Sequence, residues 1–275
     1  MSEPMMKRFH ITGRQTVIAL ALGGYAKDPP EKLAATDQDT DLSTSLFWSA
    51  AESRAQGDLT AAATLCRQSH STNPERADAL IGLGQVLLAA GTPKPAADAF
   101  RKSLIIDAGN VEALRGLGNA LIVIDQPEMA LGHYDQTVAF APEDARIYNG
   151  LCVANDLLGK HSEAQEYYRN CLLYKADDLH LLTNLGLSLS FSGKHDEAIE
   201  VLRKLVDSSH ATPHHRQNLA LVFGLAGRRK DAAKISRIDL DRHAVRANLA
   251  YYATLRTLSV STQRVKAVHA RNAVR

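Results

Sequence analysis

Residues 79–91, ALIGLGQVLLAAG, and residues 95–107, PAADAFRKSLIID, decide the fold. Each stretch has apolar residues at helical spacing, and the first ends on a glycine, which commonly stops a helix. Only a few residues separate them, so they predict two helices paired as a hairpin. Small residues such as Gly84 and Ala96 let the paired helices approach closely, whereas a larger side chain would splay them.

The hairpin is a repeated unit, because three columns of residues recur with a step of 34. The columns are Ala62, Ala96, Ala130, Ala164, Ala198 and Ala232; Gly57, Gly91, Asp125, Gly159, Gly193 and Gly227; and Ala50, Gly84, Gly118, Cys152, Gly186 and Ala220. The second column predicts a turn with a left-handed backbone, which favours glycine and tolerates Asp125. The prolines Pro74, Pro142 and Pro213 fall between units, where a helix must end.

The spacing resembles the tetratricopeptide repeat over residues 43–238, read as six units without gaps. The units are expected at 43–76, 77–110, 111–144, 145–178, 179–212 and 213–238. One hairpin cannot bury its apolar face alone, so the units should stack into an all-α, right-handed superhelix, an α-solenoid with a concave face. We expect a capping helix at 239–258, with Leu249, Tyr252 and Leu255 covering the last repeat.

Composition excludes several classes of function. The 275 residues are 45% hydrophobic and 23% charged with a net charge of +2, so charge gives no reason to expect a nucleic-acid partner. After residue 25 no apolar run approaches the roughly 20 residues that span a bilayer. Residues 259–275 carry four arginine or lysine residues and no acid, and are expected to be a basic, flexible tail.

The N-terminus resembles an export signal. In TVIALALGGYAKDPP, residues 16–30, a short apolar core follows basic residues and precedes small residues. We expect a signal over residues 1–26, starting at Met1, Met5 or Met6, and a linker over 27–42. Tyr25 stands where a lipoprotein would carry its lipid-bearing cysteine, and a tyrosine cannot form the thioether. Export without lipidation is therefore the expectation.

The sequence offers little for catalysis. It has no nucleophile-elbow, zinc-protease or phosphate-loop motif, and HATPHH at 210–215 has no cysteine or acid to complete a metal site. We therefore expect no enzyme activity, metal, cofactor or small-molecule substrate. Cys66, Cys152 and Cys171 lack zinc-like spacing, and the helical rise separates the last two by roughly 10 Å along the hairpin. Buried thiols are favoured over a disulfide, although the pairing stays open.

The first helix of each unit should line the concave groove and bind protein. The groove is expected to be polar in its middle and apolar towards its C-terminal end, which suits a peptide backbone or carboxylate first and aliphatic anchors next. The predicted lining residues are Arg115, Asn119, Arg146, Asn149, Asp156, Leu187, Phe191, Leu221 and Leu225. Arg115 with Asn119 resembles half of the carboxylate clamp of chaperone-binding repeats, although Gly150 replaces the second asparagine.

The C-terminal third resembles a narrower family. RQNLALVFGLAGRRKDAAKISRIDL (216–240) and VRANLAYYATLRTLS (245–259) resemble the end of the TadD proteins, which act in assembly of tight-adherence (Flp) pili. The resemblance implies a non-catalytic assembly factor on the periplasmic side of the outer membrane, with the pilus secretin or other Tad components as partners and indirect membrane association. A cytoplasmic adaptor or co-chaperone, or a regulatory subunit of a separate enzyme, stays open as an alternative.

Overall fold

The computed structural model describes residues 42–258 and Val265, and every regular element in that part of the chain is an α-helix. The predicted signal at 1–26 and most of the linker lie outside the described residues, as does the C-terminal tail apart from Val265. The helices are α1 (Leu42–Ala55), α2 (Leu59–Thr72), α3 (Ala77–Ala89), α4 (Pro93–Ile106), α5 (Val111–Val123), α6 (Pro127–Phe140), α7 (Ala145–Leu157), α8 (His161–Tyr174), α9 (Leu179–Phe191), α10 (His195–Val206), α11 (Pro213–Leu225), α12 (Arg229–Ser236) and α13 (Arg242–Thr257). Within this part of the chain no helix has the length and apolar character needed to cross a bilayer.

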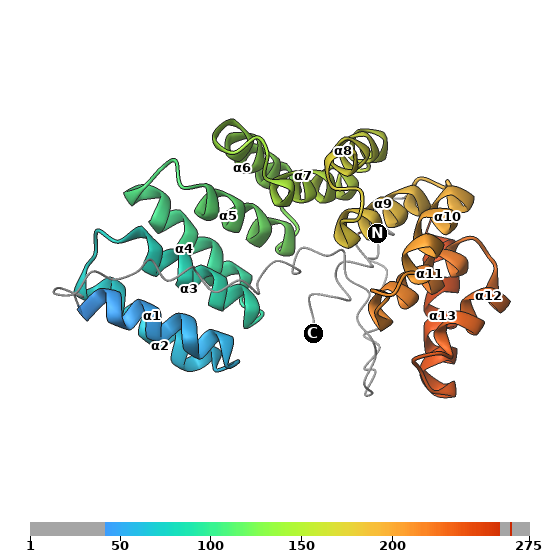
Figure 1. The fold of residues 1–275 in the computed structure, drawn as a ribbon, viewed down its shortest axis with the longest axis horizontal. Helices are drawn as coiled ribbons and strands as arrows, with labels where there is room; N and C mark the ends of the chain where they lie inside the picture. Colours follow the sequence, from blue (N-terminus) through green and yellow to red (C-terminus); the bar gives the residue numbers. More distant parts are fainter. Residues whose placement is uncertain (1–41, 259–264, 266–275) are drawn as a thin grey trace, which may run out of the picture.

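The helices pack in successive hairpins that together form an open arch (Figure 1). Each helix contacts the next in the chain, and the odd-numbered helices also contact one another from α1 to α11. These odd-numbered helices follow the inner side of the arch, and the even-numbered helices follow its outer side. The prediction of an α-solenoid is confirmed.

The turn inside each hairpin has the backbone conformation that the second column predicts. Gly57, Gly91, Gly159, Gly193 and Gly227 all have positive φ, and so does Asp125 at 60°. Among the described residues Asp125 is the only non-glycine with positive φ. This conformation is strained for most residues but is tolerated by aspartate, as the repeat spacing predicts.

Aromatic rings from outer helices fill the space between neighbouring inner helices. The Phe100 ring lies between Gly84 of α3 and Gly116 of α5, where an added Cβ would come within 2.7 Å and 2.4 Å of its carbon atoms. The Tyr134 ring lies in the same way between Gly118 and Gly150, with distances of 2.7 Å and 2.3 Å. Both rings are fully buried. The paired glycines therefore leave room for a ring that joins two units.

One hydrophobic core runs from Ile81 in α3 to the capping helix α13. Tyr252 of α13 lies against Gly224 of α11, where an added Cβ would be 2.4 Å from the tyrosine side chain. Leu249, Tyr252 and Leu255 are all buried, as expected for a cap. A second, small cluster of Ala62, Ala63 and Val86 lies between α2 and α3 and is separate from this core.

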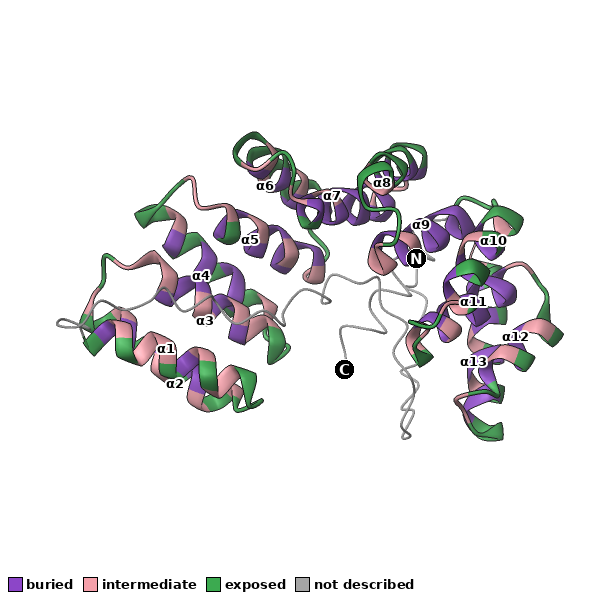
Figure 2. Ribbon diagram, viewed as in Figure 1, coloured by how far each residue is buried: buried purple, intermediate pink, exposed green. Residues whose placement is uncertain are grey.

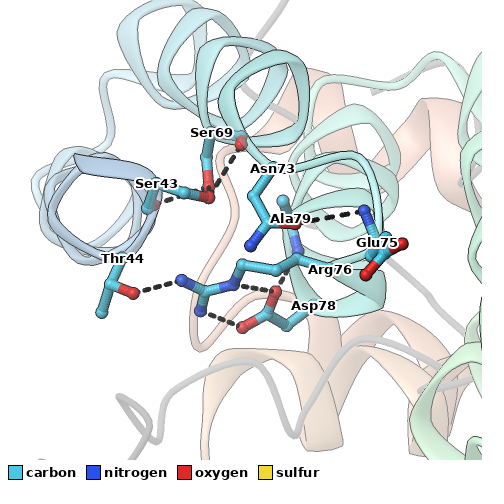
Figure 3. A network of polar contacts seen from close by, with 8 residues as sticks. All are labelled: Ser43, Thr44, Ser69, Asn73, Glu75, Arg76, Asp78 and Ala79. Carbon is cyan, nitrogen blue, oxygen red and sulfur yellow. Dashed lines mark hydrogen bonds and ion pairs between the residues drawn. The ribbon is translucent and has the colours of Figure 1, made fainter. Parts of the chain in front are cut away.

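Polar contacts hold the first hairpin together (Figure 3). The Ser43 hydroxyl lies 2.8 Å from the Ser69 carbonyl oxygen, and the Ser69 hydroxyl lies 2.7 Å from the Ser43 carbonyl oxygen. Arg76 bonds to both carboxylate oxygens of Asp78, at 3.0 Å and 2.5 Å, and also donates to Thr44. The arginine thus ties the start of α3 back to α1.

Candidate functional site: the concave groove

The N-terminal half of the groove is open. A cleft of about 180 Å³ lies along the inner helices α1 and α3 and reaches the first turn of α5. Its lining residues are Phe47, Ala50, Ala51, Arg54, Cys66, Asp78, Ile81, Gly82, Gln85, Val86 and Glu112. The Phe47 ring and the helix backbone at Gly82 give it an apolar floor, because the Phe47 ring is 3.3 Å from where a Cβ of residue 82 would lie. A cleft of this volume can hold side chains of a bound peptide.

Polar side chains cross this cleft from one inner helix to the next. Arg54 of α1 donates to the side-chain oxygen of Gln85. The side-chain nitrogen of Gln85 in turn donates to the Glu112 carboxylate of α5. The Arg76 guanidinium lies 5.7 Å from the centre of the Phe47 ring, within range of a cation–π interaction. The open half therefore combines an apolar floor with charges of both signs.

In the middle of the groove the two predicted arginines have acidic neighbours. Arg146 binds Asp144 through two nitrogens, at 2.9 Å and 2.7 Å. Arg115 is 3.7 Å from Glu112. Burial, and then the nearby positive charge of Arg146, lower the pKa of Arg115. The two positive charges suit an acidic ligand, which must compete with the existing carboxylates.

The carboxylate-clamp resemblance does not extend to this geometry. The Tyr134 hydroxyl lies 2.6 Å from Asn119 Oδ1, so the oxygen of this amide is already engaged. At Gly150, where the clamp would have its second asparagine, an added Cβ would lie 2.3 Å from the Tyr134 ring. The tyrosine ring occupies the space that a second amide would need.

The predicted polar residues Asn149 and Asp156 are buried rather than exposed to the groove. Asn149 accepts a hydrogen bond from the amide of Asn184 at 2.7 Å. Asp156 lies 2.7 Å from His161 Nδ1 and accepts from the Ser188 hydroxyl at 2.6 Å. Burial raises the pKa of Asp156, although both hydrogen bonds oppose the shift. These side chains link α7, α8 and α9.

The four predicted apolar anchors are buried as well. Leu187 and Leu221 are 0% exposed, and Phe191 and Leu225 are also in the core. Figure 2 shows most of α7, α9 and α11 in the buried colour, whereas α1 and α3 are mixed. The expectation of an accessible apolar end therefore differs from the structure, which leaves the open surface at the N-terminal half.

The cysteines and histidines considered from sequence have ordinary surroundings. All three cysteines are free thiols, and burial raises the pKa of Cys66 to about 11 and that of Cys152 well above its usual value. The His215 ring accepts from the Thr212 backbone at 3.2 Å and so takes part in a capping box at the start of α11. No cluster of potential metal ligands occurs within residues 42–258.

Sequence reasoning missed the open cleft, although the repeat contained the signal. Ile81 lies 34 residues before Arg115, and Phe47 lies 34 residues before Ile81. In the same way Gln85 lies 34 residues before Asn119. All three line the cleft. These residues occupy, in the first and second units, the repeat positions that Arg115 and Asn119 occupy in the third. The repeat therefore locates them.

Two family models match the chain. Both are described as tetratricopeptide repeat, and they match residues 52–111 and 179–209. These two stretches are tetratricopeptide repeats, and the helical hairpins between and after them follow the same pattern of packing. Such domains bind protein partners, and the fold is typically a non-catalytic scaffold for protein interaction.

Solved structures share this fold. A tetratricopeptide repeat protein from Parabacteroides merdae superposes with a TM-score of 0.66 at 16% identity, over 77% of this chain and 84% of that one. PilF of Pseudomonas aeruginosa gives 0.60 at 18% identity, over 76% and 97%. MamA gives 0.52 at 24% identity, over 60% and 91%. No curated protein matches the sequence significantly. At these identities the likeness is one of fold.

Proposed function

We propose that this protein is a non-catalytic, protein-binding scaffold in assembly of the Tad (Flp) pilus machinery, acting on the periplasmic side near the secretin. The observation that carries the binding role is the open cleft along α1, α3 and α5, which combines the Phe47 floor with the polar bridge from Arg54 through Gln85 to Glu112. Apolar pockets beside paired charges suit an extended peptide, because side chains fill the pockets and the polar groups fix its register.

The pilus role is supported by the resemblance of the C-terminal third to TadD proteins. That stretch corresponds to α11, α12 and the capping helix α13. The fold shared with PilF is compatible with this role, although its identity of 18% supports the fold alone. The pilus secretin and other Tad components are the proposed partners.

The proposed location is the periplasm, with association to the outer membrane through the partner rather than through a lipid. Tyr25 supports this because it cannot carry a thioether-linked lipid. Metabolic palmitate labelling of the protein would contradict it. N-terminal sequencing of the native protein should find a mature start near residues 24–27, whereas an intact N-terminus would favour the cytoplasmic adaptor.

A clean gene deletion with complementation tests the pilus role. We expect the deletion strain to lose surface pili and multimeric secretin, and complementation to restore both. Normal pili together with normal secretin multimers in the deletion strain would rule the role out while leaving the protein-binding cleft to be tested on its own.

A further inference from the structure

The inner helices of the C-terminal half are covered on every side. Nine consecutive residues are buried in α9, from Thr183 to Phe191, and nine in α11, from Gln217 to Leu225. Nine residues make about two and a half helical turns, so the buried run includes every face. In α1, by contrast, only Ser43 and Ala50 are buried.

Neighbouring helices cover several sides of α9. Helix α9 packs against α8 and α10 and against the inner helices α7 and α11. Its remaining side faces the interior of the arch (Figure 2). Leu187 and Leu221 belong on that side, because steps of 34 relate them to Gln85, which lines the open cleft. Gln85 is half-buried, whereas both leucines are fully buried. Something must therefore cover the groove over α9 and α11.

Val265 points to what covers it. This residue lies eight positions beyond the end of α13 at Thr257, yet it is 0% exposed. It belongs to the same hydrophobic core as Leu187 and Leu221. Val265 is therefore part of the core, although it follows the capping helix in the sequence.

We infer that residues 259–275 dock into the groove over α9 and α11, with Val265 as their anchor, and so act as an internal ligand of the array. The segment supplies Val260, Val265 and Val268 as aliphatic groups. Its 17 residues span about 26 Å even as a helix, enough to cross three inner helices at spacings of about 10 Å. Burial of aliphatic groups against Leu187 and Leu221 drives the docking.

Docking divides the groove into an open half at α1, α3 and α5 and a self-occupied half at α9 and α11. If the open half is the partner site proposed above, a partner that extends along the whole groove must displace residues 259–275. The tail then regulates binding, because it lowers the apparent affinity for any partner with its own aliphatic anchors.

Amide hydrogen exchange on the full chain tests the docking without any partner, so its outcome is independent of the pilus role. We expect Val265→Asp to speed exchange in α9 and α11 at least about tenfold while α3 is unchanged, because a carboxylate is strongly disfavoured in the apolar contact. Val265→Leu is the matched control and should keep the protection. A synthetic peptide of residues 259–275, added to the Val265→Asp protein, should restore protection, and the same peptide carrying aspartate at 265 should not.

Unchanged exchange in α9 and α11 of the Val265→Asp protein would overturn the inference, and so would failure of the peptide to restore protection. If Val265→Asp speeds exchange in every helix, the milder Val265→Ala with the same two peptides decides between docking and global unfolding. Protection of the unaltered chain that disappears on dilution, together with a dimer mass at high concentration, would assign the groove to a second copy instead.

Discussion

The hydroxyl of Tyr134 lies 2.6 Å from the amide oxygen of Asn119, and its ring separates α5 from α7. Tyr168 occupies the same repeat position one unit later, but its hydroxyl is buried without a hydrogen-bond partner among residues 42–258. Two tyrosines related by a step of 34 thus differ in a single polar contact. Comparing Tyr134 with Tyr168 therefore allows the contribution of this hydrogen bond to stability to be measured.

Tyr134→Phe should lower the free energy of unfolding by about 1–2 kcal/mol, because it removes a buried hydrogen bond and leaves the Asn119 oxygen unpaired. Tyr168→Phe is the matched control and should be neutral or slightly stabilising, since it removes an unpaired hydroxyl. Urea unfolding followed by circular dichroism measures both. Equal losses in the two variants would show that the Asn119 contact contributes nothing.

Gly116→Ala should destabilise the protein by about 2 kcal/mol, because its Cβ would lie 2.4 Å from the Phe100 ring and force the inner helices apart. Gly132→Ala is the control within the exposed face of α6, where an added Cβ meets nothing within 4 Å. The control should stabilise by about 0.5–1 kcal/mol through helix propensity. Thermal unfolding of the two variants should shift in opposite directions.

His215 should make the protein sensitive to mild acid. Burial, then the nearby charges of His214 and His180, lower the pKa of His215 from 6.5 to about 4. The folded state therefore holds the ring neutral, and its stability is lost progressively as pH falls from about 6.5 towards 4, by up to about 3 kcal/mol. His215→Gln keeps an acceptor for the capping box without titrating, so its unfolding free energy should vary less over this range. A parallel pH dependence in variant and unaltered protein would contradict the assignment.

Arg54→Ala should weaken partner capture at least about tenfold, because it removes the charged end of the bridge to Gln85 across the open cleft. Arg101→Ala is the matched control, since Arg101 lies on the outer helix α4 in an exposed pair with Asp98. Pull-down of the secretin with each purified protein measures the effect. Similar capture by both variants would move the partner site away from the cleft.

The 34-residue periodicity predicts most of the fold. The hairpin turns and the small residues of the packing columns follow from a repeat step and from simple stereochemistry. The inner and outer order of the helices follows as well, since a hairpin must bury its apolar face against the next one.

The accessible surface could not be predicted in the same way. Repeat position identifies which side chains point inward, but not which of them a distant segment covers. Leu187 and Leu221 were predicted as anchors for a partner, yet both are fully buried in the structure. Phe47 and Gln85 line the open cleft, and the repeat phase relates them to Arg115 and Asn119, but the sequence analysis left them out.

The first hairpin is attached differently from the rest of the arch. Its contact with α3 is made by a small apolar cluster, by Phe47 and Cys66 against Gly82, and by polar bonds of Arg54 and Arg76, whereas the later units share rings inserted between two inner-helix glycines. In a linear array each unit is held only by its neighbours. Mechanical tension between the two ends would therefore peel α1 and α2 away first, and a load transmitted through the array would be sensed at the N-terminal end before the shared core yields.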